Sequence, residues 1–265
     1  FRSGYSMTSG NSNTAFGAQS LYSNTTASNN TAVGYQAGYS NTTGSVTAFG
    51  QGSLYSNVTG DGNSAFGVSA LTANTGNYNS AFGWRAGYGN TSGTQNLFVG
   101  YATGYGNTTG GNNAAVGNTA MYTNTTGSYN VALGVDALRL NTTASNNTAV
   151  GYRAGYSLTT GASNTIVGND AGYSLTGDTN TFVGKDAGYY ITSGSKNTII
   201  GKYQGNQGGL DIRTASNYIV LSDGDGNPRG IFDNNGAFLV GQTSAASRKF
   251  VVNGSVDSNF LASLF

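Results

Sequence analysis

The chain has 265 residues, of which 43 are glycine, one is proline (Pro228) and none is histidine or cysteine. Charged residues make up 8% of the chain and the net charge is +1, so charge gives no reason to expect nucleic acid or an anionic membrane as a partner. The chain lacks the commonest general base, the usual zinc ligands and any disulfide, and no apolar run is long enough to predict membrane insertion. We therefore expect no cofactor and no metal, in a chain that is a processed product or a segment of a longer protein.

A phrase of the form N-T-A-(V/F)-G recurs from the N-terminus to about residue 205. Disordered, low-complexity sequence would not keep one spacing over so many copies. The repeat therefore predicts an all-β fold: a parallel β-solenoid of about twelve 16–17-residue coils over residues 1–205, with two short strands and two turns in each coil. The phrases close at Gly17, Gly34, Gly50, Gly67, Gly83, Gly100, Gly117, Gly134, Gly151, Gly168, Gly184 and Gly201.

The residue before each closing glycine is always apolar, and the residue before that one is usually alanine. Because successive side chains of a strand point to opposite faces, we expect the larger apolar residue in the core and the alanine against a close neighbour. A lone solenoid needs only one buried face, so this pattern predicts a bundle of three chains around an axis.

Three further rows follow the same phase. The closing glycine is expected to supply a tight bend or a positive φ angle. Asparagine recurs four residues before it and seven residues after it, and tyrosine recurs five residues after it. In a stack, we expect the asparagine amides to form ladders from coil to coil and the tyrosine rings to stack along the rod.

Residues 206–265 depart from the repeat. Strands are predicted at 218–221, 230–232 and 237–240, separated by the turn sequences Asp-Gly-Asp-Gly-Asn-Pro and Asn-Asn-Gly, with a further strand at 249–252. This segment is expected to be a small β-rich module that caps the open edge of the last coil or connects it onward.

The phrases NTAVGYQAGYSNTTGS (30–45) and NTAVGYRAGYSLTTGAS (147–163) resemble the head repeats of trimeric autotransporter adhesins and the related repeats of phage tail-fibre proteins. Residues 216–241 are similar to phage tail-fibre shafts and collars. The resemblance implies a parallel β-roll, a homotrimer and a role in surface attachment. The autotransporter repeat is usually shorter than 16–17 residues, which favours the phage-fibre relatives.

Two acidic motifs have the spacing of known functional sites. Asp223, Asp225 and Asn227 have the spacing of a calcium loop, but Pro228 and Asn234 stand where its glycine and bidentate glutamate belong, so a plain turn is predicted. The second motif is a row of acids at one repeat position. Asp170 and Asp186 lie on consecutive coils, near the separation of a retaining-glycosidase pair, and Asp136 lies two coils earlier. Basic residues are close enough to neutralise this row, so we interpret it as a solvated charged face. Its members are Asp136, Asp170 and Asp186, beside Arg153 and Lys185.

Two further sets concern carbohydrate. Aromatic residues directly after a closing glycine are candidates for contacting a glycan, against the alternative that they pack on neighbouring turns; they are Tyr35, Trp84, Tyr101 and Tyr152. Glycosylation sequons recur on one edge, against the alternative that N-T-T simply suits a corner; they are Asn24, Asn41, Asn57, Asn90, Asn107, Asn124 and Asn141.

The sequence thus predicts a structural protein and not an enzyme: the shaft or head of a trimeric, extracellular tail-fibre-like adhesin that presents a multivalent surface to cell-surface glycans. An end-to-end extracellular filament of the same chain is the alternative, and a polysaccharide-degrading spike ranks third. The expected partners are other copies of the chain and surface carbohydrate.

Overall fold

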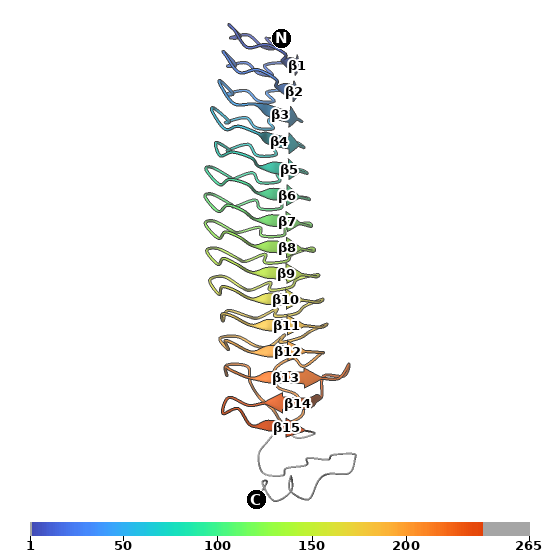
Figure 1. Ribbon diagram of the computed structural model, residues 1–265. Coiled ribbons are helices and arrows are strands. Elements are labelled where there is room, and N and C mark those ends of the chain that lie inside the picture. The colour runs from blue at the N-terminus through green and yellow to red at the C-terminus, as the bar shows by residue number, and fades with distance from the viewer. Residues whose placement is uncertain (1, 241–265) are drawn as a thin grey trace, which may run out of the picture.

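In the computed structural model, which describes residues 2–240, the chain is a straight stack of coils with one short strand in each (Figure 1). The predicted all-β, parallel solenoid of about twelve coils is confirmed. One sheet runs the length of the stack, and its strands lie in chain order. The twelve repeat strands are β1 (Thr14–Phe16), β2 (Thr31–Val33), β3 (Val46–Phe49), β4 (Asn63–Phe66), β5 (Ser80–Phe82), β6 (Leu97–Val99), β7 (Ala114–Val116), β8 (Val131–Leu133), β9 (Thr148–Val150), β10 (Thr165–Val167), β11 (Thr181–Val183) and β12 (Thr198–Ile200).

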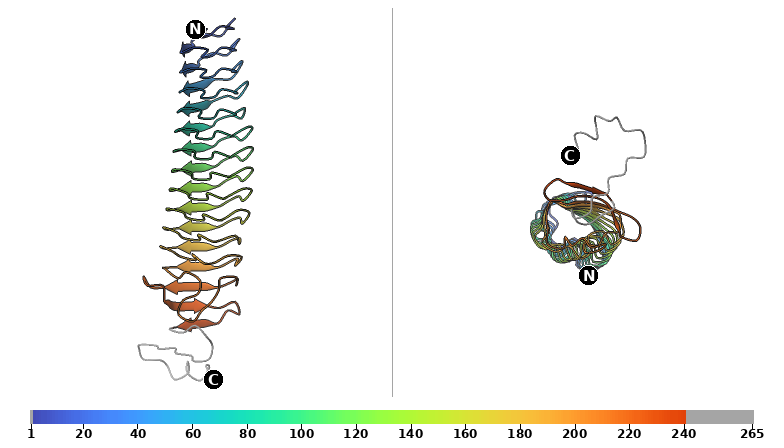
Figure 2. Two further views of the ribbon diagram at one scale, coloured as in Figure 1. Left: turned by 180° about the vertical axis from the view of Figure 1, so that it is seen from behind. Right: turned by 90° about the horizontal axis from the view of Figure 1, so that it is seen from below.

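Equivalent residues of neighbouring coils lie directly opposite each other. Ala32 pairs with Ala48, and Ala149 pairs with Ile166, in parallel register. The rest of each coil is bonded in the same way, as where the Leu21 N–H donates to the Ala37 carbonyl at 3.0 Å. The coils therefore superpose when viewed along the rod (Figure 2).

The prediction of two strands per coil is wrong, because the second phrase forms a run of turns. Residues two and four positions after the closing glycine have positive φ angles, as at Gln19 (60°) and Leu21 (48°), and an extended strand cannot contain them. A coil of 16–17 residues has to return on itself within this phrase, and repeated left-handed residues provide the curvature.

Across residues 2–240, no helix is both long and apolar enough to cross a bilayer.

The core position is also corrected. The residue two positions before each closing glycine, which is usually alanine, points inward; Ala32, Ala81 and Ala132 are fully buried. The larger apolar residue that follows, predicted to be in the core, points outward on the sheet. Since both positions are apolar, alternation along the strand does not decide which of them faces inward. The inner position holds alanine in most coils and a large, fully buried side chain in the others, namely Phe98, Ile166, Phe182 and Ile199.

Interior volume is balanced between facing positions. Where the inward strand residue is Phe98, the residues that approach its ring are Gly87 and Gly104, and a Cβ at either would lie within 3.0 Å of ring carbons. Where the strand residue is Ala132, the residue at the position of Gly104 is Leu138, which is fully buried. Large and small residues thus alternate so that the interior stays filled.

The closing glycines have the predicted positive φ angles, with Gly117 at 137°. A Cβ on Gly117 would lie 2.5 Å from the carbonyl carbon of Gly134 in the next coil. The row is therefore confined to glycine by backbone conformation and by the close stacking of coils.

The predicted asparagine ladders are confirmed. The Asn124 amide nitrogen donates to the Asn107 side-chain oxygen at 2.6 Å and to the Gly127 carbonyl at 3.0 Å. In the second row, the Asn79 backbone N–H donates to the Asn63 side-chain oxygen at 2.9 Å. These amides are fully or almost fully buried, and the ladders satisfy most of their polar groups. The exceptions are the side-chain oxygens of Asn24 and Asn141, at the two ends of the first row, which accept no hydrogen bond from residues 2–240.

The tyrosine row stacks as predicted. Tyr22 and Tyr39 lie with ring centroids 5.2 Å apart and planes 3° apart, and the other members repeat this geometry. The row is interrupted at Thr72 and Arg139, which occupy the tyrosine position in their coils. Each ring therefore covers the faces of its neighbours and leaves mainly edges to solvent.

The last three described strands extend the same sheet. Strand β13 (Ile219–Ser222) pairs in parallel with β12, whereas β14 (Pro228–Phe232) and β15 (Phe238–Val240) follow in antiparallel order. They lie within two residues of the predicted strands, and both predicted turns are present. The strand predicted at 249–252 lies outside the described residues.

Each coil is numbered by the strand with which it begins. Coil 12, which runs from β12 to β13, is longer than the others, and its interior is filled differently. Tyr203 is fully buried, and its hydroxyl donates to the Leu210 carbonyl at 2.8 Å. This burial raises the pKa of the Tyr203 phenol well above its usual range.

Candidate functional surfaces

The outward apolar residues form a continuous strip on the sheet, which we call the outer ladder. It consists of the residue before each closing glycine: Phe16, Val33, Phe49, Phe66, Phe82, Val99, Val116, Leu133, Val150, Val167, Val183 and Ile200. Phe49 and Ile200 are each 49% exposed, and Leu133 is 38% exposed. With coils about 4.8 Å apart, this strip is roughly 55 Å long.

The candidate glycan residues Tyr35, Trp84, Tyr101 and Tyr152 are all exposed, but not as one open platform. Trp84 stacks on Tyr101 with centroids 4.8 Å apart, and the Arg85 guanidinium lies 4.2 Å from the centroid of a Trp84 ring. The Arg153 guanidinium likewise lies 4.7 Å from the Tyr152 ring centroid. These contacts occupy ring faces that a sugar would use.

Tyr35 lies beside Ala18 of the coil before it. These two residues line a shallow groove of about 410 Å³ together with Arg2, Gln19 and Tyr22.

The sequon asparagines are inside the rod. All seven are fully buried, and their amides donate hydrogen bonds within the stack, as Asn90 does to the Gly93 carbonyl at 3.0 Å. A glycosylating enzyme cannot reach these nitrogens in the folded chain. The geometry favours the corner interpretation of the N-T-T sequence.

The acidic row is paired in part. The Asp170 carboxylate, which is almost fully buried, lies 2.7 Å from the Arg153 Nε, and the Asp136 carboxylate lies 2.8 Å from Arg139. The close contact with the Asp170 carboxylate is the main cause that raises the pKa of Arg153. Asp186 is half-buried and forms no ion pair with the described residues. The three acids therefore do not form a matched pair flanking a cleft.

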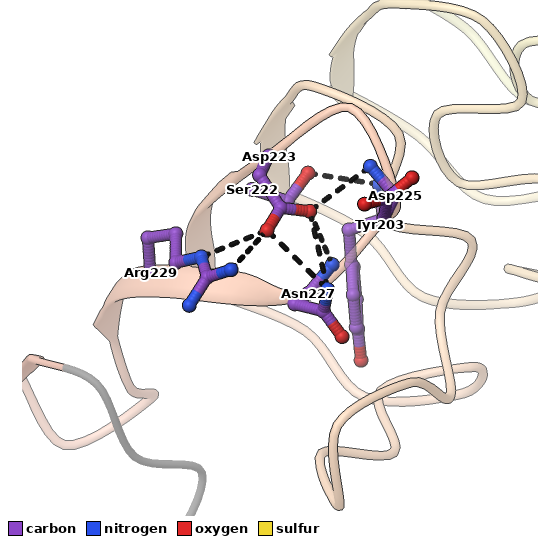
Figure 3. Close-up of polar contacts among 6 residues, drawn as sticks. All are labelled: Tyr203, Ser222, Asp223, Asp225, Asn227 and Arg229. Carbon is purple, nitrogen blue, oxygen red and sulfur yellow. Dashed lines mark hydrogen bonds and ion pairs between the residues drawn. The ribbon is translucent and has the colours of Figure 1, made fainter.

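The calcium-like sequence forms a turn between β13 and β14, drawn in Figure 3. One Asp223 oxygen accepts the backbone N–H groups of Asp225 at 3.0 Å and Asn227 at 2.9 Å, and the other accepts the Arg229 Nε at 2.8 Å. These donors, with the Asn227 backbone foremost, hold the pKa of Asp223 well below its usual range. Over residues 2–240, no group of three or more acidic residues is placed to hold a metal ion.

A second groove was not found from the sequence. It has a volume of about 550 Å³ and is lined by Ser174, Tyr190, Thr192, Asp211, Arg213 and Thr214. It forms where coils 10 and 11 meet the longer coil 12. The available signal was Tyr190, which stands where the other coils carry serine or another non-aromatic residue.

No family model, curated protein or solved structure matches this chain.

Proposed function

We propose that the chain is a rigid segment of an extracellular attachment fibre, in which three copies pack through their outer ladders and present side surfaces to cell-surface carbohydrate. The observation that carries this proposal is the exposed outer ladder. Monomeric soluble proteins rarely leave apolar patches larger than a few hundred Å² open to water. A strip this long on a regular rod is suited to lateral packing against copies of itself.

The proposal gives the chain a mechanical role without a catalytic step. Bonding between coils around their circumference favours a stiff rod, and several copies in one fibre would turn weak contacts with sugars into firm attachment by avidity. The stoichiometry of three and the placement on a virion fibre or cell surface rest on the resemblance to tail-fibre and adhesin repeats.

A printed array of neutral and acidic oligosaccharides tests this function. We expect the wild type to bind a subset of the array, and the double variant Val116→Lys/Leu133→Lys to bind about 100-fold more weakly, because dissociated chains lose avidity. Asn118→Lys is the matched control, since Asn118 is also exposed on coil 7 but lies outside the outer ladder. A wild type that binds no glycan, or a dissociated variant that binds equally well, contradicts the proposal.

An end-to-end filament is the second candidate. In β1, the Thr14 N–H donates toward coil 2 and the Phe16 carbonyl accepts from coil 2. Because backbone groups of successive strand residues point in opposite directions, the N–H and carbonyl of Ala15 point away from coil 2, toward the open end of the rod. On that side, no strand among residues 2–240 pairs with β1. Such an edge can accept a strand from another copy. Rods that lengthen as concentration rises would favour this candidate.

A further inference from the structure

The groove between Tyr190 and Arg213 combines an aromatic ring, an ion pair and hydroxyl groups on one face. From this combination we infer that it is a binding site for a neutral hexopyranose unit of a surface glycan. The inference deepens the proposed attachment function and rests on it.

The groove is built from departures from the repeat. Tyr190 lies six residues after Gly184, a position that holds only small, hydroxyl or aliphatic residues in the earlier coils: Ser23, Ser40, Ser56, Ala73, Gly89, Gly106, Thr123, Leu140, Ser157 and Ser174. Arg213 occupies a position that holds threonine in the two coils before it. The equivalence is shown by the hydrogen bonds between coils: the Thr176 N–H donates to the Thr192 carbonyl, and the Thr192 N–H donates to the Arg213 carbonyl, each at 2.8 Å. The earlier coils fold without these residues, so the fold alone does not explain them.

The Tyr190 ring is exposed and lies outside the parallel tyrosine stack. Its ring meets Tyr189 at an interplanar angle of 77°, whereas the other ring pairs of the tyrosine row are nearly parallel. Tyr190 is 45% exposed and therefore stands out of the stack. An aromatic face of this kind combines apolar contact area with a polar hydroxyl, which suits the C–H face of a sugar ring.

The ion pair beside the ring supplies polar groups in fixed positions. The Arg213 Nε lies 3.0 Å from one Asp211 oxygen, and its terminal nitrogen lies 2.7 Å from the other. Both side chains remain about half exposed, so further donor and acceptor positions face solvent. A carboxylate and a guanidinium side by side match adjacent sugar hydroxyls, which both donate and accept.

The balance of charge in the groove favours a neutral sugar. Asp211 and Arg213 cancel, and the remaining polar lining residues are Ser174, Thr192 and Thr214, whose side chains are uncharged. The hydrogen bonds from Arg213 lower the pKa of Asp211. The carboxylate therefore stays ionised throughout the neutral and mildly acidic range, and binding is expected to be constant there.

The test replaces two groove residues with the residues that other coils carry at the equivalent positions. Tyr190→Ser and Arg213→Thr place residues that neighbouring coils carry at those positions, so both variants are expected to fold. On the same oligosaccharide array, followed by competition with the free methyl glycosides of glucose, galactose and mannose, we expect each variant to weaken binding to neutral glycans about tenfold or more. Tyr190→Phe keeps the ring and is expected to retain binding within about threefold.

Trp84→Ala is the control, since it removes an exposed aromatic residue far from the groove. If the wild type binds glycans and Tyr190→Ser and Arg213→Thr bind them equally well, this site is overturned but the attachment function is preserved. Loss of binding in Trp84→Ala alone moves the site to the middle of the rod. A wild type that binds only acidic glycans overturns the neutral-sugar assignment, and one that binds no glycan overturns both the site and the attachment function.

Discussion

Individual residues in this rod are constrained mainly by the equivalent residues one coil away. A closing glycine faces the next closing glycine, and a ladder asparagine bonds to the next asparagine. Because every coil repeats these contacts, a single substitution disturbs two interfaces between coils while leaving distant coils intact.

Gly117→Ala is predicted to destabilise coils 6–8. The added Cβ would meet the Gly134 backbone at 2.5 Å, and a non-glycine residue at a φ of 137° adds strain of about 1–3 kcal/mol. Amide hydrogen exchange should accelerate in these coils and remain unchanged in coils 1–3.

Gly224→Ala is the control for this change, since a Cβ there has no atom within 4 Å. Equal protection of coils 6–8 in the two variants would show that the close stacking of glycines is not a constraint.

Asn124→Ala is predicted to cost about 1–3 kcal/mol of unfolding free energy, because it leaves the buried Asn107 side-chain oxygen without its donor. The Gly127 carbonyl keeps a second donor, the Asn113 amide, at 2.9 Å. Asn118→Ala removes an exposed amide and should change stability by less than about 0.5 kcal/mol. Urea unfolding followed by circular dichroism measures both. A similar cost for the two variants would contradict the ladder.

Each strand has an inner and an outer residue with different tasks. Ala132 is fully buried in the narrow interior, and its neighbour Leu133 belongs to the outer ladder. The inner residue controls the stability of the coil, whereas the outer residue is available for contacts between chains.

Ala132→Leu is therefore predicted to destabilise the chain by about 1–3 kcal/mol, because buried Leu138 already provides the large residue of that coil. Leu133→Ala should change the stability of single chains by less than about 0.5 kcal/mol. Thermal unfolding compares the two in a background that carries Val116→Lys, in which the chains are kept apart. A larger loss from Leu133→Ala would place the core on the other face of the strand.

At the same scale, the sequence predicts some features well and others poorly. The constant phase of Gly117 and its equivalents predicts stacking and register, and rows such as Asn124 and Tyr22 predict what one coil places above the next. The sequence does not decide whether Ala132 or Leu133 faces inward. Successive strand side chains point to opposite faces, so either residue could be the inner one, and the space inside the coil depends on where the turns lie. The groove at Tyr190 was missed because its partners, Asp211 and Arg213, come from a coil whose length departs from the repeat.

At the scale of the whole molecule, the hydrogen bonds between coils favour a stiff rod but leave the outer ladder exposed to solvent. The fifteen strands of residues 2–240 form one continuous sheet, so the rod is expected to transmit force along its length without a hinge in that range. Covering the ladder with copies of the chain removes apolar surface from water and multiplies any sugar-binding groove on the sides.

The most direct test of this account is the light-scattering mass of the purified chain, with negative-stain imaging, for the wild type and for Val116→Lys/Leu133→Lys. We predict that the wild type forms straight rods of three chains whose mass is independent of concentration. The double variant, whose changed residues lie on the outside of the coils, should give thinner single-chain rods of the same length. A wild type that remains a single chain at every concentration, or a variant that keeps the mass of the wild type, would contradict assembly through the outer ladder.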